Sequence, residues 1–216
     1  MTPPATTAMG RLQEVRNHPG QACEKRTTIM DIAELHSRAL DATRRVIAGV
    51  RQDQWAAPTP CEGWDVRALV NHVVSGNLWA AELAAGKTIS DVGDHLDGDV
   101  LGADPLGAYD ASAKATAAVF AIPGALTAPC AVSYGPVPGT VYAGHRFIDV
   151  LIHGWDVAAA TRQDTKLRPA LVDACLDIIA PQTELLHASG AFGDKIELAD
   201  ASDAQTRLLA TLGRRG

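Results

Sequence analysis

The chain has 216 residues, of which 47% are hydrophobic and 5% aromatic, and its formal net charge is −6 at pH 7. This length allows one sizeable core, and an alanine-rich, aromatic-poor composition favours packed helices over a β-sandwich. A net negative charge spread along the chain argues against nucleic acid as a partner, which a basic patch or stripe would indicate. No segment approaches the ~20 apolar residues that span a bilayer. Residues 1–21 lack the apolar run of a secretory signal, so a cytoplasmic location is expected.

Three helices are predicted in the first part of the chain. Residues 1–28 show no clear period and are expected to form a loose extension. Apolar residues then recur at helical spacing from Asp31, a good N-cap, to Val50. A second helix is predicted from Asp65 to Gly86, and a third opens at Asp104-Pro105 and ends near Ile122. The turn-rich stretches between them are expected to be loops.

The second part of the chain contains one ambiguous stretch and three further elements. Within residues 127–139, residues 131–134 are compatible with a short strand or an extended loop. A long helix follows from Val141 to Thr161, and another opens at Arg168-Pro169 and is kinked or ended by Pro181. An extended piece over residues 195–198 and a helix over residues 203–212 complete the tail.

These elements predict an all-α fold with three regions. Residues 1–28 form the extension, residues 29–190 form a helical bundle, and residues 191–216 form a short C-terminal α/β appendage packed on the bundle.

The four cysteines have no metal-ligand or redox spacing. Cys23, Cys61, Cys130 and Cys175 are scattered along a large apolar chain, so reduced and mostly buried thiols are expected. Cys61 is the one near a candidate motif, and it is a candidate for lining the site rather than a nucleophile.

The most informative stretch runs from Asp149 to Asp156. Residues four and seven apart share one face of a helix, so Asp149, His153 and Asp156 project together from an apolar surface. A carboxylate and an imidazole are costly to bury there without a partner, and a divalent metal suits both. His72, on the second helix, supplies a third ligand in this interpretation. Asp156 is then the acceptor that fixes an imidazole tautomer.

Simpler interpretations of the same residues exist. A single histidine on an apolar helix face, such as His72, is often a core residue bonded to a carbonyl. Asp149 and His153 also suit a plain ion pair on a solvated face. The remaining histidines are expected to be solvated, and Trp64 and Trp155 to be packing residues. These histidines are His18, His36, His95, His145 and His187.

Two motifs resemble a known family. Thr59-Pro-Cys-Glu-Gly-Trp-Asp-Val-Arg67 with Leu69-Val-Asn-His72, and Asp149-Val-Leu-Ile-His153-Gly-Trp-Asp156, are similar to the motifs of the mycothiol-dependent maleylpyruvate isomerase type of metal-binding domain. That domain belongs to the DinB-like superfamily. The tail from Phe192 to Arg214 is similar to the ending of one subgroup, so the resemblance covers about residues 29–216.

The resemblance implies a four-helix DinB-like fold and a divalent metal, usually zinc. Its ligands match His72, Asp149 and His153, although the isomerase has glutamate where this chain has Asp149. The chain is expected to be too short for the larger C-terminal domain of the isomerase, so maleylpyruvate is not expected as its substrate.

The function expected from the resemblance is a thiol-dependent S-transferase or isomerase. The metal would activate the thiolate of mycothiol, or of a similar small thiol, for attack on a small electrophile. Trp64, Tyr134 and Cys61 would line the pocket. The alternatives are a non-catalytic metal- or ligand-binding bundle and a plain dimeric interaction protein. The sequence is also compatible with a homodimer, and neither a membrane nor nucleic acid is expected as a partner.

Overall fold

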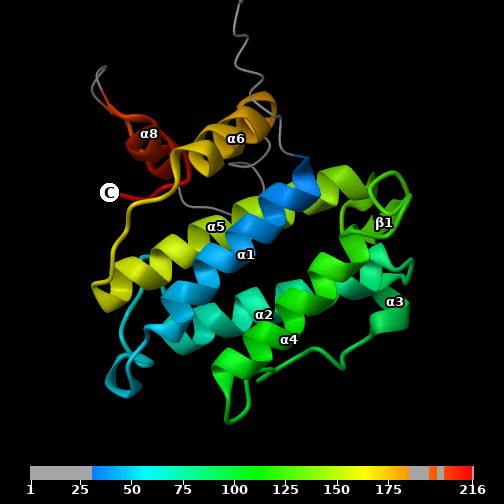
Figure 1. Ribbon diagram of the computed structural model, residues 1–216, viewed down its shortest axis with the longest axis horizontal. Helices are drawn as coiled ribbons and strands as arrows, with labels where there is room; N and C mark the ends of the chain where they lie inside the picture. The colour runs from blue at the N-terminus through cyan, green and yellow to red at the C-terminus, as the bar shows by residue number, and fades with distance from the viewer. Residues whose placement is uncertain (1–30, 185–194, 199–201, 216) are drawn as a thin grey trace, which may run out of the picture.

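A computed structural model describes residues 31–184, 195–198 and 202–215, and four long helices form its body. As Figure 1 shows, α1 lies beside α5, and α2 beside α4; α2 also contacts α5. This arrangement confirms the predicted all-α bundle. The four helices are α1 (Ile32–Ala48), α2 (Val66–Ala84), α4 (Pro105–Phe120) and α5 (Gly139–Thr161).

Aspartate caps explain where the helices begin. The carboxylates of Asp31, Asp65 and Asp104 accept hydrogen bonds from backbone amides three residues later, at 2.8, 2.8 and 3.0 Å. Each bond satisfies an amide that the first helical turn leaves unpaired, a contribution of about 1 kcal/mol. Pro105 follows its cap at the first position of α4. The three predicted helix starts are therefore confirmed.

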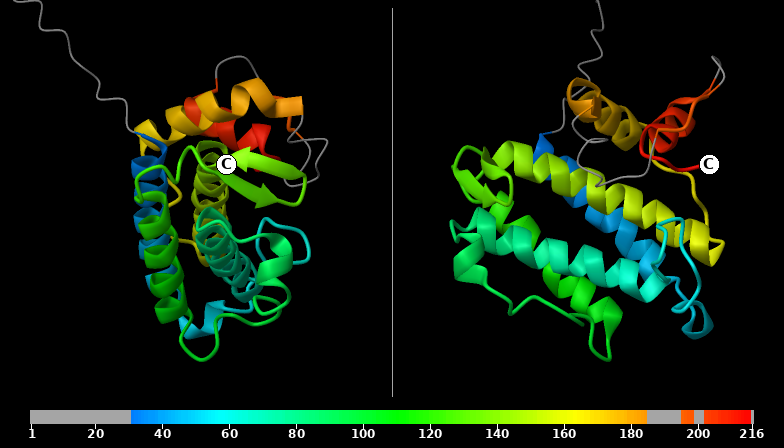
Figure 2. Two further views of the ribbon diagram at one scale, coloured as in Figure 1. Left: turned by 90° about the vertical axis from the view of Figure 1, so that its right-hand side faces the viewer. Right: turned by 180° about the vertical axis from the view of Figure 1, so that it is seen from behind.

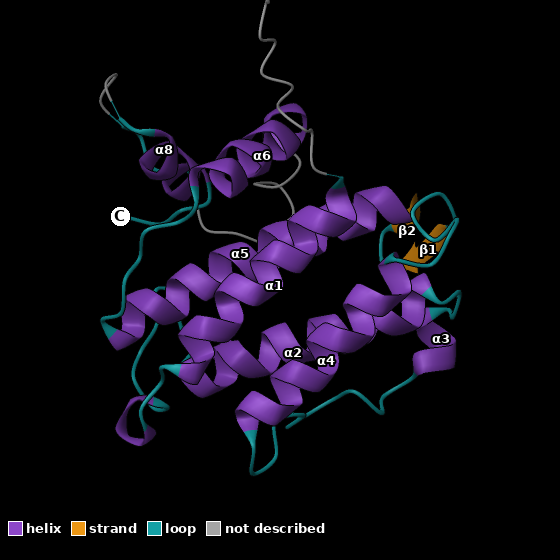
Figure 3. Ribbon diagram, viewed as in Figure 1, coloured by secondary structure: helices purple, strands orange, loops and turns teal. Residues whose placement is uncertain are grey.

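Smaller elements close the ends of the bundle, as Figure 3 shows. The loop predicted between α2 and α4 contains a short helix, α3 (Ile89–Val92). The ambiguous stretch is an antiparallel hairpin of β1 (Pro129–Val132) and β2 (Gly135–Pro138). A 3-10 turn, η1 (Gln52–Gln54), precedes α2.

The C-terminal helices pack together beside α5. Helix α6 (Pro169–Ile179) contacts α8 (Ala204–Thr211), and both lie on one side of the bundle in Figure 2. Pro181 falls in a second 3-10 turn, η2 (Ala180–Gln182), as its position predicts. Residues 195–198 are not part of a strand, but the Ile196 amide donates to the Ala210 carbonyl at 2.9 Å. The appendage is thus tied to the bundle through α6 and α8.

A close approach between α1 and α5 fixes how these two helices pack. The Thr43 hydroxyl donates to the Val150 carbonyl at 2.9 Å, and Gly154 lies directly against Thr43. A Cβ atom at Gly154 would overlap the Thr43 hydroxyl, so glycine permits the contact. Phe147 and Leu151 fill the core on the same helix.

The prediction that His36 is solvated is wrong. His36 is fully buried on α1 and packs edge-on against Phe120, with ring centroids 5.4 Å apart. The buried side of α1 includes His36, Leu40, Thr43 and Ile47, so the apolar stripe is wider than the sequence interpretation assumed. His145 is half-buried rather than solvated, whereas His95 is exposed, as predicted. His18 and His187 lie outside the described residues.

The described cysteines are free thiols. Cys130 and Cys175 are buried and Cys61 is half-buried, whereas Cys23 lies outside the described residues. Burial raises the pKa of the Cys175 thiol to about 12. The expected extension over residues 1–28 also lies outside the described residues. Among the helices described, none is long and apolar enough to cross a membrane.

Candidate metal centre

His72, Asp149 and His153 lie together between α2 and α5. Nε2 of His72 is 3.2 Å from Oδ1 of Asp149, and Nε2 of His153 is 3.5 Å from the same oxygen. The two imidazole rings meet edge to face with centroids 5.0 Å apart. One donor atom from each of the three residues falls within 4.8 Å of the others. Two helices far apart in sequence therefore bring two nitrogens and one carboxylate oxygen to one point.

Arg146 holds the other oxygen of Asp149. Its Nη1 donates to Oδ2 of Asp149 at 2.9 Å, and its Nη2 donates to Oδ1 of Asn77 at 3.1 Å. The guanidinium lies directly against Gly76, where a Cβ atom would overlap it. Burial works to raise the pKa of Asp149, but Arg146 and His153 outweigh it and hold this pKa well below its usual range. Asp149 is therefore an anchored carboxylate with Oδ1 facing the histidines.

Asp156 sets the orientation of the His153 ring. Nδ1 of His153 lies 3.0 Å from Oδ2 of Asp156, which is fully buried. Burial works to lower the pKa of His153, but Asp149 and Asp156 outweigh it and raise this pKa to about 10. An Nδ1–H donated to a carboxylate leaves Nε2 as the nitrogen directed at Asp149 and His72.

Cys61 and Arg214 complete the surroundings of Asp156. The Cys61 thiol lies 3.2 Å from Oδ2 of Asp156 and 3.7 Å from Nδ1 of His153. Arg214, from the segment after α8, donates to both oxygens of Asp156, at 3.2 and 2.9 Å. Burial works to raise the pKa of Asp156, but His153 and Arg214 lower it below its ordinary value. The C-terminal segment therefore contributes to the site.

Trp64, two residues before α2 begins, packs beside the two histidines. Its ring centroid is 4.8 Å from that of His72 and 6.3 Å from that of His153. The His72 side chain is still 39% exposed, whereas that of His153 is 7% exposed. The site is therefore buried on the His153 side and open to the surface beside His72 and Trp64.

Tyr134 occupies a different position on the hairpin turn. Its hydroxyl lies 2.7 Å from Nδ1 of His145, which is one helical turn before Asp149 on α5. Tyr134 is 65% exposed, so this pair lies at the surface. The structure thus brings together His72, Asp149, His153, Asp156, Cys61 and Trp64, and places Tyr134 beside His145.

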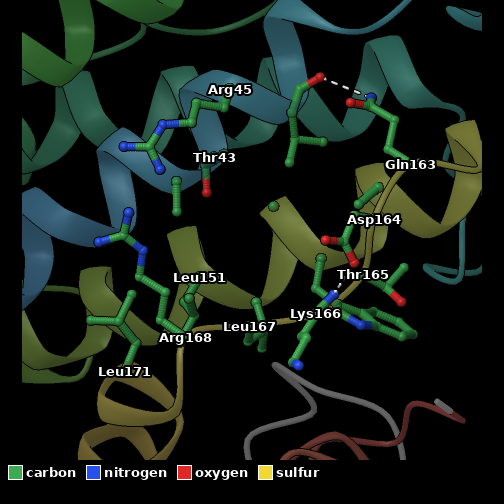
Figure 4. Close-up of a pocket in the computed structure, with 15 residues that line it drawn as sticks. Thr43, Arg45, Leu151, Gln163, Asp164, Thr165, Lys166, Leu167, Arg168 and Leu171 are labelled. Atoms are coloured by element: carbon green, nitrogen blue, oxygen red, sulfur yellow. Dashed lines mark hydrogen bonds between the residues drawn. The ribbon is translucent and has the colours of Figure 1, made fainter.

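A cavity of about 300 Å³ lies between α1, α5 and the connection to α6 (Figure 4). The labelled side chains include Arg45, Lys166 and Arg168, and Gln163 donates to the Val46 carbonyl at 2.9 Å. The part of α5 that lines it, Leu151 to Ala158, presents the helix face opposite to Asp149 and His153. This cavity is separate from the histidine cluster.

The donor set of the cluster fits a divalent transition metal. Two imidazole nitrogens and one carboxylate oxygen are the ligand types of catalytic zinc sites, which keep one position for water or substrate. Asp156 orients His153 and Arg146 orients Asp149, and metal sites commonly have such outer hydrogen-bond partners for their ligands.

The sequence interpretation missed Arg146 and Arg214. Arg146 has a local signal, because it lies three residues before Asp149 and therefore reaches the same helix face. Arg214 has none, because 58 residues separate it from Asp156 and only the docking of the C-terminal segment brings them together.

Comparisons with known proteins identify the family of the chain. The family model of the mycothiol maleylpyruvate isomerase N-terminal domain matches residues 36–158, which contain all three clustered residues. Two proteins of Mycobacterium tuberculosis are each 40% identical to the chain over 157 residues, 71% of this chain and 82% of each relative. They are Uncharacterized protein MT0763 of strain CDC 1551 / Oshkosh and Uncharacterized protein Rv0738 of strain ATCC 25618 / H37Rv. No solved structure gives a significant match. The chain belongs to the mycothiol maleylpyruvate isomerase N-terminal domain family, within the DinB-like superfamily.

Proposed function

We propose that this protein binds a divalent metal, zinc by preference, through His72, Asp149 and His153, and acts as a thiol-dependent S-transferase or isomerase. The observation that carries the proposal is the convergence of three donor atoms within 4.8 Å at a site open on one side. A fully enclosed four-ligand site would instead suit a structural metal.

The surrounding residues have distinct tasks in this proposal. Asp156 accepts the Nδ1–H of His153 and so directs the Nε2 lone pair into the site. Arg146 holds Asp149 through Oδ2 and leaves Oδ1 for the metal. Trp64 supplies an apolar wall beside His72, where the carbon skeleton of a small substrate can pack.

The metal would supply the activation of a thiol. A free thiol has a pKa near ~8.5 and is mostly protonated at neutral pH, whereas a coordinated thiol is deprotonated. The family description supports mycothiol, or a similar small thiol, as the cofactor. The electrophile would enter from the exposed side, past Trp64 and His72.

The test is the pH dependence of thiol alkylation. Mycothiol and a small alkylating reagent are mixed with zinc-loaded protein, and the rate of alkylation is measured from about pH 5 to about pH 10, a range that includes the free thiol pKa of ~8.5. The proposal predicts a midpoint well below that of the free thiol.

Two variants provide the controls. H153A is expected to return the midpoint to that of free mycothiol, while H95A, which changes a histidine outside the cluster, is expected to behave like the wild type. A zinc-loaded wild type whose midpoint matches that of free mycothiol would reject the thiol-activation step and favour a non-catalytic metal-binding bundle.

A further inference from the structure

Two groups of potential metal ligands share His153. His72 and Asp149 approach its Nε2, as described above. Cys61 and Asp156 approach its Nδ1, with distances of 3.7 and 3.0 Å. One donor atom from each of Cys61, His153 and Asp156 also falls within 4.8 Å of the others. Thiolate, imidazole and carboxylate are all zinc ligands, so this second group is chemically competent to bind a metal.

Arg214 lies against both competing donors of the second group. Its Nε and Nη2 donate to the two carboxylate oxygens of Asp156, and Nη2 also lies 3.3 Å from Sγ of Cys61. The Arg214 side chain is 7% exposed. A buried planar guanidinium that bonds both oxygens of a carboxylate is a fixed cation at that position.

The two carboxylates of the site differ in what their arginines leave accessible. Arg146 bonds Asp149 through Oδ2, and Oδ1 remains directed at the histidines. Arg214 donates hydrogen bonds to both oxygens of Asp156. Oδ2 of Asp156 also lies within hydrogen-bond distance of Nδ1 of His153 and of the Cys61 thiol. A divalent cation that approached Nδ1 of His153 would meet a guanidinium and a carboxylate with both oxygens engaged.

We infer that Arg214 determines which nitrogen of His153 binds the metal, by withholding Cys61 and Asp156 from coordination. This inference rests on the metal site proposed above. Arg214 is a positioning residue on this account. It keeps both oxygens of Asp156 engaged and holds a positive charge against Sγ of Cys61, so that the metal is held by two imidazoles and one carboxylate.

The test uses cobalt(II) in place of zinc, because cysteine ligation to cobalt produces a near-ultraviolet charge-transfer absorption. The wild type is expected to bind one cobalt without this absorption. R214Q is expected to gain it, as Cys61 releases its proton to solvent and binds the ion. The double variant C61S/R214Q is expected to lose it again. The matched control is R207Q, because Arg207 is an exposed arginine on α8. The cobalt spectrum of R207Q is expected to be that of the wild type.

Two further variants separate the charge of Arg214 from a structural role. R214K keeps a cation beside Cys61, so the charge-transfer absorption is expected to stay absent. The single variant C61S, which keeps Arg214, is expected to have the cobalt spectrum and the cobalt affinity of the wild type. This measurement does not depend on whether any Arg214 variant folds. Circular dichroism checks the fold of each variant.

Several outcomes would overturn the inference. A wild type that already shows the cysteine-to-cobalt absorption, or a C61S variant with an altered spectrum, would mean that Cys61 is a ligand in the native protein. A folded R214Q with the wild-type spectrum would mean that Arg214 withholds nothing. R214K that gains the absorption would exclude charge as the cause.

Failure of the proposed function gives a different result. A wild type that binds no cobalt would reject the site at His72, Asp149 and His153. The role of Arg214 would still be decided by R214Q: a cysteine-ligated ion would support it, and no bound ion would overturn it.

Discussion

The His153 ring and the Asp156 carboxylate face each other across one turn of α5, with Nδ1 3.0 Å from Oδ2. This contact fixes the ring so that Nε2 points to Asp149 and His72. The metal site proposed here therefore depends on a residue that does not itself bind the ion.

Replacing Asp156 with asparagine is expected to weaken zinc binding. The variant keeps an oxygen near Nδ1 of His153 but loses the negative charge that favours a proton on Nδ1. Loss of such a hydrogen-bond partner to a ligand typically lowers metal affinity by about 10–100-fold. Competition titration with a chromophoric chelator measures the change. The same substitution at the exposed Asp173 on α6 should leave zinc affinity unchanged. Equal affinities in all three proteins would mean that Asp156 does not orient the ligand.

Replacing Asp149 with asparagine is expected to destabilise the metal-free protein. The change leaves the buried guanidinium of Arg146 without its carboxylate partner, which costs about 3 kcal/mol. The exposed pair of Arg44 and Asp110 provides the control, because Asp110→Asn there should cost less than about 1 kcal/mol. Urea unfolding of the three proteins compares the two losses, and losses of equal size would contradict this description of Arg146.

Gly76 and Gly144 are expected to respond oppositely to alanine. A Cβ atom at Gly76 would overlap the Arg146 guanidinium and displace it from Asp149, at a cost of about 1–3 kcal/mol. At Gly144 the nearest atom to an added Cβ is 3.7 Å away, in the methyl of Ile178. Alanine within this helix should therefore stabilise by about 0.5–1 kcal/mol. Thermal unfolding measures both, and a stable G76A with full zinc affinity would contradict the prediction.

His36 is expected to make the protein sensitive to acid. Burial, with a smaller contribution from Arg146 that Asp149 partly opposes, lowers its pKa to about 3. Neither ring nitrogen has a hydrogen-bond partner among the described residues. The unfolded chain takes up a proton below about pH 6.5 while the folded chain does not, so stability is lost as pH falls toward 3, by about 1.4 kcal/mol per pH unit.

The variant His36→Leu removes this group and is expected to reduce the loss of stability between about pH 7 and about pH 4.5. The contribution comes from the roughly two pH units below the ordinary histidine pKa of about 6.5, at ~1.4 kcal/mol per unit. Unfolding free energies at the two pH values provide the measurement. His95→Leu is the control, because His95 is exposed at the surface. An identical pH dependence in wild type and H36L would show that His36 does not titrate as described.

Much of the fold was predictable because its signals are local. The aspartate caps at Asp31, Asp65 and Asp104 and the apolar spacing of the four long helices are properties of short stretches of chain. Asp149, His153 and Asp156 share a face by helical periodicity alone. His72 was already a candidate third ligand, but spacing cannot tell a ligand from a core histidine, and the family resemblance favoured the ligand role.

The remaining features depend on tertiary packing. Arg214 reaches Asp156 only because α8 and the residues after it dock beside α5. His36 is buried because α1 contacts both α5 and α4, which covers more of its surface than a single apolar stripe suggests. The hairpin over residues 129–138 is defined by pairing between strands, which a single short apolar run does not reveal.

The central claim is tested most directly by the metal content of the purified protein. Elemental analysis after zinc reconstitution and desalting should find about one equivalent of zinc in the wild type and in H95A, as expected for one three-ligand site. H72A and H153A should fold, as judged by circular dichroism, and lose the metal. A wild type without metal, or H72A and H153A that both retain it, would contradict the claim and leave the histidine cluster as an internally paired polar core.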